Sequence, residues 1–351
     1  MLKKAKQATL SSLKASGVST LIHNSKWRRQ RLLILAYHGI AVSDEDLWNG
    51  SYFISADMFR TRLQLLRKSR CVVLPLGQAI ERLYAKDLPD RAVSITFDDG
   101  SVDFYTKAFP LLKEFDFPVT LYLTTFYSHY QRPAFDLACS YLLWKGRDEI
   151  LDLGKITRRD ARIRLVDPAA RETTSAELRA FAREQKLSAE EKDQLAASLA
   201  AHLKVDYDAL LQRRALHILK PEEISELASQ GVDIQLHTHR HRTPRDREMF
   251  IREIEDNRKS IHEMTGKRAS HFCYPSGVYA SEFLPWLSEA GVASGTTCEI
   301  GLATSESNPL LLPRVLDVSS LSSIEFEGWL TGISAALPRR TQTKEARRAR
   351  L

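Results

Sequence analysis

Short apolar runs alternate with helical patterns along most of this chain, and no other feature constrains the fold as strongly. The apolar or extended runs lie at residues 32–37, 72–74, 93–97, 119–125, 231–236, 270–274, 292–297 and 311–318. Between them, helical spacing of apolar residues occurs at 57–69, 76–84, 104–115, 221–229, 246–265, 281–290 and 322–335. Strands that alternate with helices are typical of a parallel sheet or barrel, so the sequence predicts an α/β fold.

The alternation lapses between about residue 128 and residue 219, where the chain is charged and rich in alanine. Helical patterns are predicted there at 175–185 and 188–202. Ser175 is expected to begin the first of these helices. Ser188, followed three residues later by Glu191, is typical of a capping box at the start of the second. We interpret this stretch as a helical insertion.

One large domain is expected to hold most of the 351 residues, 43% of which are hydrophobic. It spans 32–335 and includes the insertion, with a basic arm at 1–31 and a basic, disordered tail at 336–351. The formal net charge is +7, and cations are concentrated in both ends. These ends either contact an anionic membrane surface or are solvated, and solvated ends are the commoner case. No RNA- or DNA-binding signature accompanies the charge, so no nucleic-acid partner is expected.

Cysteine spacing and the N-terminus bear on the compartment. The chain has four cysteines, Cys71, Cys139, Cys273 and Cys298. They are widely spaced and form no CxxC pair, which excludes a disulfide framework and a zinc finger and favours a reducing compartment. No signal peptide or transmembrane segment is evident, because the apolar run at 32–37 is too short to span a bilayer. The expectation is a cytoplasmic protein, either free or resting on a membrane.

Two adjacent carboxylates end the run at 93–97. Asp98, Asp99 and Gly100 follow it directly, and Asp and Gly are poor strand residues but good turn residues. Neighbouring residues at a strand end point in different directions, so one aspartate is suited to bind a metal while the other handles a proton. From this motif alone, a plain turn with solvated aspartates is an equally good interpretation.

Three other predicted strands also end in reactive groups: His38, the segment from His237 to His241, and the turn Pro275-Ser276-Gly277. The carboxyl ends of parallel strands share one face, so these groups are expected to converge. His237 and His241 are four residues apart and can aim both imidazoles at one point. With Asp99 they would form a site for a divalent metal, with Zn²⁺ favoured and Fe²⁺, Co²⁺ and Ni²⁺ as alternatives. His239, like His202, His217 and His262, is interpreted as surface or structural.

Such a site would suit hydrolysis. A metal with open positions acidifies water and polarises an acyl oxygen, and Asp98 could then take the proton from that water. The backbone at Ser276 could present an N–H to the tetrahedral oxyanion, and His38 could protonate the leaving nitrogen. The competing interpretation of His38, a strand-end histidine bonded to the backbone, is favoured when that residue is considered alone.

Three motifs in order resemble the metal-dependent polysaccharide deacetylases, the NodB-homology domains of carbohydrate esterase family four. The segment 96–100 is similar to the family's TFDDG, which implies Asp98 as base and Asp99 as metal ligand. The segment 237–241 is similar to H-[ST]-x-x-H and implies His237 and His241 as the other ligands. The segment 272–277 resembles the groove motif whose backbone donates to the oxyanion, which implies that role for Ser276. The resemblance covers roughly residues 32–318 apart from the insertion.

This chain departs from the family's common form in three respects. Cys273 stands where the common form carries an arginine that holds the base. The common form also has a C-terminal histidine as the general acid, but this sequence has no histidine after His271. Ser276 also replaces a tyrosine. The branch that deacetylates poly-N-acetylglucosamine carries an N-terminal Tyr-His instead, to which Tyr37-His38 is similar, and this resemblance favours His38 as the acid.

The resemblance implies a distorted (β/α)₇-like barrel with a helical insertion. It also implies a metal-dependent hydrolase of carbon–nitrogen bonds, which removes N-acetyl groups from N-acetylhexosamine units of a glycan or glycan precursor with a metal-bound water as nucleophile. The expected partner is therefore a carbohydrate that carries N-acetyl groups. Two alternatives stay open: an O-acetyl esterase or small-amide hydrolase with the same site, and a catalytically inactive glycan-binding protein.

Overall fold

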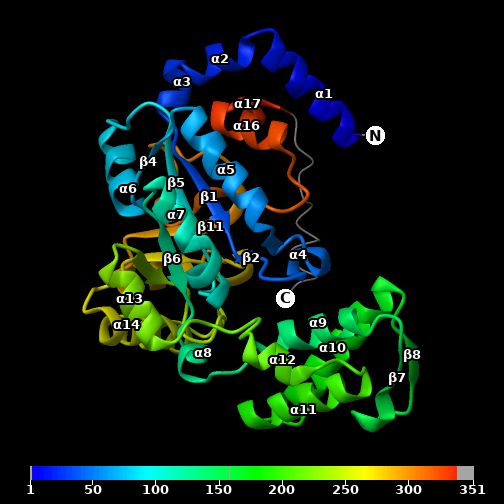
Figure 1. Ribbon diagram of the computed structural model, residues 1–351. Coiled ribbons are helices and arrows are strands. Elements are labelled where there is room, and N and C mark those ends of the chain that lie inside the picture. Colours follow the sequence, from blue (N-terminus) through cyan, green and yellow to red (C-terminus); the bar gives the residue numbers. More distant parts are fainter. Residues whose placement is uncertain (1, 158, 338–351) are drawn as a thin grey trace.

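Parallel strands close into a barrel surrounded by helices (Figure 1). The computed structural model describes residues 2–157 and 159–337, so most of the predicted tail at 336–351 lies outside the described residues. Around the barrel the order is β1-β12-β11-β10-β9-β6-β5, and pairing of β1 with β5 closes it. The strands are β1 (Leu33–Tyr37), β5 (Ala92–Phe97), β6 (Thr120–Leu123), β9 (Asp233–Leu236), β10 (His271–Cys273), β11 (Ser294–Ile300) and β12 (Leu312–Leu316). The predicted α/β fold, a distorted (β/α)₇ barrel, is confirmed.

The distortion is visible where β5 meets its neighbours. β1 pairs with β5 from Val93 to Phe97 along one edge. The other edge is shared: the short β4 (Val72–Val73) pairs with Ala92 and Val93, and β6 pairs with Thr96 and Phe97. β11 and β12 also change register between Thr296 and Ile300. The barrel is therefore closed but irregular.

Alternate residues of the strands have different surroundings. On β5, Val93, Ile95 and Phe97 belong to the large core between the strands and the outer helices. Ser94 and Thr96 are also buried, and strand periodicity directs them to the opposite face, the barrel interior. Ser94 and Thr96, the polar residues in the alternating pattern that predicted this strand, therefore supply polar atoms inside the barrel.

Most outer helices match the sequence prediction. They are α5 (Ala56–Lys68), α6 (Leu76–Ala85), the π-helix η1 (Phe104–Ala108) with α7 (Phe109–Phe115), α13 (Pro221–Ser229), α14 (Arg247–Thr265), α15 (Phe283–Glu289), α16 (Ser323–Thr331) and α17 (Ile333–Ala336). α14 begins after Asp246, whose side chain accepts from the Met249 N–H, and ends at Gly266 in the left-handed conformation. The prediction of a single helix at 322–335 is wrong, because Gly332 at φ 88° ends α16 and separates it from α17.

The stretch between residues 128 and 219 folds beside the barrel (Figure 1). It contains α9 (Phe135–Lys145), α10 (Pro168–Glu184), α11 (Ala189–His202), α12 (Tyr207–Gln212) and the hairpin of β7 (Ile150–Asp152) and β8 (Arg162–Arg164). The capping box of Ser188 and Glu191 is confirmed. The start predicted at Ser175 is wrong: α10 begins at Pro168 after Asp167, because aspartate as N-cap with proline at the first position is a strong start signal.

The N-terminal arm forms α1 (Leu2–Ala15), α2 (Val18–His23) and α3 (Lys26–Arg29), which lie over α16 at one end of the barrel (Figure 1). Arg28 anchors the arm. Its buried guanidinium donates to three backbone carbonyls: Leu330 at 2.9 Å, Arg31 at 2.6 Å and Ala92 at 3.3 Å. None of the helices in 2–157 and 159–337 has the length and apolar character needed to cross a membrane.

Candidate active site

Asp99, His237 and His241 lie together at the carboxyl ends of β5 and β9, and their ligand atoms are all within 4.8 Å of one another. Asp99 Oδ1 lies 3.0 Å from His237 Nε2 and 3.1 Å from His241 Nε2. His237 Nδ1 is 2.8 Å from the carbonyl oxygen of Cys273. A proton on Nδ1 that donates to this carbonyl leaves the Nε2 lone pair directed toward Asp99, the tautomer that a metal ligand requires.

The backbone around these residues adopts the left-handed region. Asp99 has φ 70°, Thr238 has φ 63° and His241 has φ 54°. Such conformations are uncommon for non-glycine residues and cluster at functional sites. Gly100 follows with φ 84°, and a Cβ there would lie 2.3 Å from Leu123 Cδ1, so this position requires glycine.

Asn257 on α14 fixes the start of the histidine segment. Its Oδ1 accepts from the His237 N–H at 2.9 Å, and its Nδ2 donates to the Leu123 carbonyl at 2.9 Å and to Thr125 Oγ1 at 3.0 Å. Thr125 Oγ1 is also 2.8 Å from His239 Nδ1. His239 thus contacts a supporting threonine and is not part of the cluster of Asp99, His237 and His241.

Electrostatics prepare this cluster for a cation. Burial alone would raise the pKa of Asp99, but His241 and His237 outweigh it and hold the pKa well below its usual range. Burial would likewise lower the pKa of His241, but Asp99 raises it above its usual value. An ionised carboxylate and two imidazole nitrogens that converge at one point are a donor set suited to Zn²⁺ and to Fe²⁺. These residues therefore fit a divalent metal.

Asp98 is held by Arg314 of β12. Arg314 Nη1 lies 2.7 Å from Asp98 Oδ1 and Nη2 lies 2.7 Å from Oδ2, and both side chains are buried. The same guanidinium donates to the Thr297 carbonyl at 3.0 Å and to Thr96 Oγ1 at 3.2 Å. Burial would raise the pKa of Asp98, but Arg314 outweighs it and lowers that pKa to about 2. The carboxylate is therefore ionised at every ordinary working pH.

The sequence had left the group that holds Asp98 unassigned, because the family's usual arginine is replaced by Cys273. Arg314 makes this contact from a different strand, 216 residues away in the chain. One signal could have found it: Arg314 is a lone charge in the otherwise apolar extended stretch from Leu310 to Leu316. A charge in a buried strand is rare unless it is paired.

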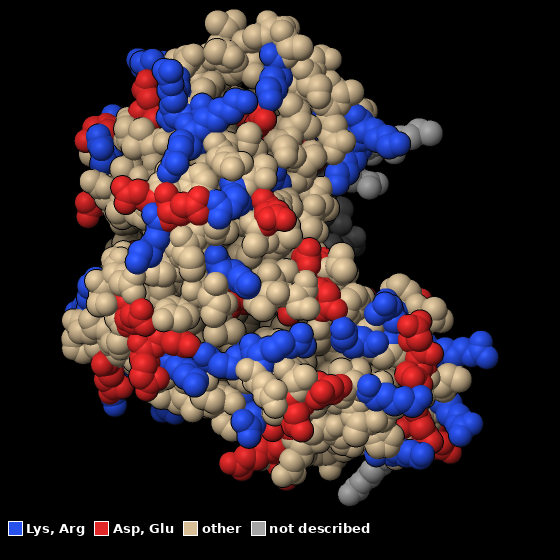
Figure 2. All heavy atoms as spheres, in the orientation of Figure 1, with Lys and Arg blue, Asp and Glu red and all other residues tan. Residues whose placement is uncertain are grey.

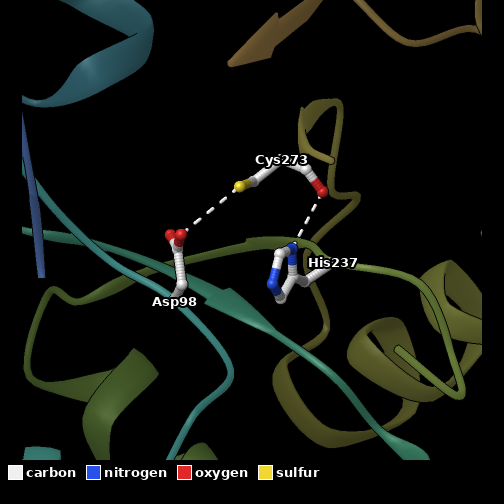
Figure 3. A group of neighbouring side chains, drawn as sticks. All are labelled: Asp98, His237 and Cys273. Carbon is white, nitrogen blue, oxygen red and sulfur yellow. Dashed lines mark hydrogen bonds between the residues drawn. The ribbon is translucent and has the colours of Figure 1, made fainter. Parts of the chain in front are cut away.

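Asp98, His237 and Cys273 form a second group with potential ligand atoms (Figure 3). Cys273 Sγ lies 3.5 Å from Asp98 Oδ2, whereas His237 points its Nδ1 at the Cys273 carbonyl (Figure 3). Arg314 Nη2 is 3.0 Å from the same sulfur. Burial raises the pKa of Cys273 well above its usual value, so the thiol stays protonated. A metal here would face a guanidinium and a neutral thiol, so this group does not fit one.

His38 lies next to Asp98 at the end of β1. Its Nε2 is 3.8 Å from Asp98 Oδ2, too far for a hydrogen bond, and its Nδ1 is buried without a partner in the described part of the chain. The interpretation as a histidine bonded to the backbone therefore finds no support. Burial lowers the pKa of His38, against the opposing effect of Asp98 and Asp99.

The turn after β10 is the 3₁₀ helix η3 (Pro275–Gly277), with Ser276 exposed at φ 56°. The Gly277 N–H donates to the Tyr274 carbonyl at 2.9 Å, and the Val278 N–H donates to the Pro275 carbonyl at 3.1 Å. Among the described backbone bonds, none uses the Ser276 N–H. This N–H is therefore free to donate to a ligand.

Tyr52 is a site residue that sequence reasoning missed. Its hydroxyl donates to Asp99 Oδ2 at 2.5 Å, and its ring lies 4.8 Å from the His38 ring. It comes from the loop between α4 (Glu45–Trp48) and β3 (Phe53–Ile54), not from a barrel strand. Nothing in the spacing of the sequence signals it. By fixing one oxygen of Asp99, Tyr52 leaves the other oxygen for the two histidines.

Removal of this hydroxyl gives a first testable prediction. Tyr52→Phe is expected to weaken Zn²⁺ binding about 10- to 100-fold, the usual effect of losing a hydrogen bond that orients a metal ligand. Competition with a chromogenic chelator measures the affinity. Tyr105→Phe is the matched control, since Tyr105 donates to the exposed Glu226 at 2.7 Å, away from the site. Unchanged affinity in Tyr52→Phe would mean that Asp99 needs no such support.

Asp103 supports the segment that follows His38. Its Oδ2 accepts from the Ile40 N–H at 2.6 Å, and the side chain is buried. Burial raises its pKa from the usual 3.8 to about 6. The protonated form therefore fits the folded state better than the ionised form does.

This shift predicts a pH dependence of stability. Because the pKa of Asp103 is raised in the folded state, its protonated carboxyl contributes stability that is fully present below pH 4. This contribution is lost as the pH rises through about 6. Asp103→Asn, which keeps an acceptor but no charge, is expected to gain on the order of 3 kcal/mol relative to the wild type between pH 4 and pH 8. Urea unfolding of both proteins at pH 4, 6 and 8 measures the difference. A difference that does not vary with pH would contradict the assignment.

The fold and the site define the class of this protein: an α/β barrel with a candidate metal centre and a buried aspartate–arginine pair at the ends of its strands. The sequence profile of the polysaccharide deacetylase family matches residues 85–152 and 185–295. The chain belongs to this family. The matched segments include Asp98, Asp99, His237 and His241, but His38 and Arg314 lie outside them.

Several curated proteins match part of the chain. The poly-beta-1,6-N-acetyl-D-glucosamine N-deacetylase of Escherichia coli K12 is 29% identical over 100 residues, which are 28% of this chain and 15% of that protein. The protein of the same name from Staphylococcus epidermidis is 30% identical over 110 residues, 28% of this chain and 38% of that protein. This chain therefore matches well under half of each relative's length.

Solved structures match nearly the whole chain. Streptococcus pyogenes deacetylase PplD, in complex with acetate, has a TM-score of 0.56 at 18% identity and covers 88% of this chain and 99% of its own. IcaB from Ammonifex degensii has a TM-score of 0.52 at 18% identity and covers 86% of this chain and 97% of its own. At these identities the likeness shows the fold alone.

Proposed function

We propose that this protein is a metal-dependent hydrolase that removes N-acetyl groups from N-acetylhexosamine units of a glycan or glycan precursor. One observation carries the proposal: Asp99, His237 and His241 converge next to the Asp98–Arg314 pair in a chain of the polysaccharide deacetylase family. The names of the curated relatives, which are N-deacetylases of poly-β-1,6-N-acetyl-D-glucosamine, support the same reaction.

Asp99, His237 and His241 would hold the divalent cation, with Zn²⁺ favoured. When bound, such an ion acidifies a water molecule and polarises the acyl oxygen of the substrate. Tyr52 keeps Asp99 oriented, and the Cys273 carbonyl keeps His237 Nε2 directed toward Asp99, where these residues would hold the ion. The protein's part at this position is to fix three ligands in advance.

Proton transfer falls to Asp98 and His38. Asp98 is ionised and held in place by Arg314, so its carboxylate is in the form that accepts a proton from the attacking water. His38, whose Nε2 is 3.8 Å from Asp98 Oδ2, is positioned to give a proton to the leaving nitrogen. The Ser276 N–H, which has no backbone acceptor in the described chain, donates to the oxyanion.

Acetate release tests this function. Chitooligosaccharides and oligomers of β-1,6-linked N-acetylglucosamine are expected to release acetate, and a chelator is expected to stop the release until Zn²⁺ is restored. An O-acetylated sugar and a small acetanilide serve as the competing substrates. Faster turnover of the ester or the small amide would replace the proposed substrate class. No turnover of any acyl substrate by the Zn²⁺-loaded protein would favour a glycan-binding role.

A further inference from the structure

A cavity of about 350 Å³ lies between the N-terminal arm and the barrel. Its lining comes from α1, α2, the end of α5, the residue before β5, and α16 with α17. Arg91, which lines it, directly precedes β5, and Asp98 directly follows that strand. A six-residue strand is about 20 Å long, so the cavity and the candidate active site lie at opposite ends of the barrel.

Positive charge dominates this cavity. Lys14, Lys68, Arg70 and Arg91 line it, and Glu327 is the acidic residue among them. Glu327 is already paired with Lys14. Lys68, Arg70 and Arg91 form no ion pair with any described residue. Figure 2 shows Lys and Arg side chains over the end of the molecule that the arm occupies. Like charges gathered around one hollow repel one another unless an anion lies between them.

Two buried nitrogen atoms at the same place have no partner. His23 is 8% exposed and lines the cavity, and its Nδ1 has no hydrogen bond within 2–157 and 159–337. Its Nε2 is 3.1 Å from the Ser69 carbonyl, to which it donates. Arg91 Nε is also buried and unpartnered, although the Arg91 guanidinium donates to Asn24 Oδ1. Buried polar atoms without partners are rare in folded proteins, and a bound ligand, ion or water is a common explanation for them.

We propose that this cavity binds a phosphate group. Phosphate oxygens accept several charge-assisted hydrogen bonds at once, which guanidinium groups in particular supply. Lys68 and Arg70 provide charge from the end of α5, and Arg91 provides it from the barrel. His23, once protonated, donates from Nδ1. The bound dianion offsets the repulsion among the three unpaired cations.

The phosphate can be free in solution or the headgroup of a lipid. Leu21 of α2, a helix that lines the cavity, is 73% exposed, and Trp27 of the following helix α3 is 38% exposed. Exposed apolar side chains beside cations are typical of helices that lie on a membrane surface. A headgroup phosphate would therefore allow the arm and the cavity to act together.

Calorimetric titration of the full chain with inorganic phosphate, at constant ionic strength set with chloride, tests the site. The double variant Lys68→Gln/Arg70→Gln changes two exposed residues and is expected to fold. It should bind phosphate at least about tenfold more weakly than the wild type, since a hydrogen bond to a charged group is worth that much or more. Arg91→Gln should weaken binding similarly. Arg183→Gln, an exposed arginine in α10, is the control and should bind like the wild type.

Two further experiments show where the phosphate binds and whether it comes from a lipid. If His237→Ala abolished binding while Lys68→Gln/Arg70→Gln did not, phosphate would occupy the metal site and the proposal would fail. Sedimentation with phosphatidylcholine vesicles, with and without phosphatidic acid, tests the lipid. If the acidic vesicles capture the wild type but not the double variant, the ligand is a lipid headgroup. If the protein binds inorganic phosphate but is not captured by the vesicles, the ligand is a soluble phosphate. Absence of both, or equal binding by all variants, overturns the site.

Discussion

Asp98→Asn is expected to lower kcat/KM for acetate release about a thousandfold, within the range usual for removal of a general base. The amide has the shape of the carboxylate but cannot accept the proton of the attacking water. Because Asp98 is paired with Arg314 and not with the cluster of Asp99, His237 and His241, the variant should still bind metal. Initial rates and the Zn²⁺ content of the same preparations separate the two effects.

Asp103→Asn is the matched control for this variant. It places the same amide at a buried aspartate near the same end of the barrel, where the side chain contacts the Ile40 N–H and no proposed catalytic group. Its rate should stay near that of the wild type. If Asp98→Asn retained full activity with bound Zn²⁺, the proton would have to go elsewhere, and His38 would become the leading candidate for the base.

The positions of Asp99, His237 and His241 could be anticipated from the sequence because each follows from a local rule. Apolar runs identified the strands, parallel strands present their carboxyl ends on one face, and a four-residue spacing can bring two imidazoles together. The structure brings the ligand atoms of these residues within 4.8 Å of one another. Local periodicity was also sufficient for most outer helices, although it misplaced the start of α10, where Asp167 and Pro168 outweigh Ser175.

The roles of Arg314 and Tyr52 could not be predicted from the sequence, because neither follows from such a local rule. Arg314 reaches Asp98 only because β1 lies between β12 and β5 and closes the barrel, a relation between segments 216 residues apart. Tyr52 reaches Asp99 from a loop whose path depends on the pairing of β3 with β2 (Gly39–Ile40). Contacts that depend on barrel closure and loop paths carry no periodic signal. They are nevertheless the contacts that fix the two aspartates.

Arg314→Met is expected to destabilise the folded protein by about 3–5 kcal/mol, because it leaves the buried carboxylate of Asp98 without its partner. The effect should depend on pH. In the wild type the pKa of Asp98 is lowered to about 2, so its stabilising contribution is present above pH 4 and is lost only as the pH falls toward 2. Without Arg314, burial raises this pKa instead. The stability difference between the two proteins should therefore grow as the pH rises from 4 to 7.

Urea unfolding of the chelator-treated proteins in a double-mutant cycle measures this pair. Asp98→Asn alone leaves the Arg314 guanidinium buried without its carboxylate, so it too should be destabilised. The double variant Asp98→Asn/Arg314→Met removes both charges and should be more stable than either single variant, since no uncompensated charge remains. Additive losses would mean that the two side chains are not coupled as the 2.7 Å contacts imply. Recovery of stability without recovery of activity would show that the pair is kept for the reaction and not for the fold.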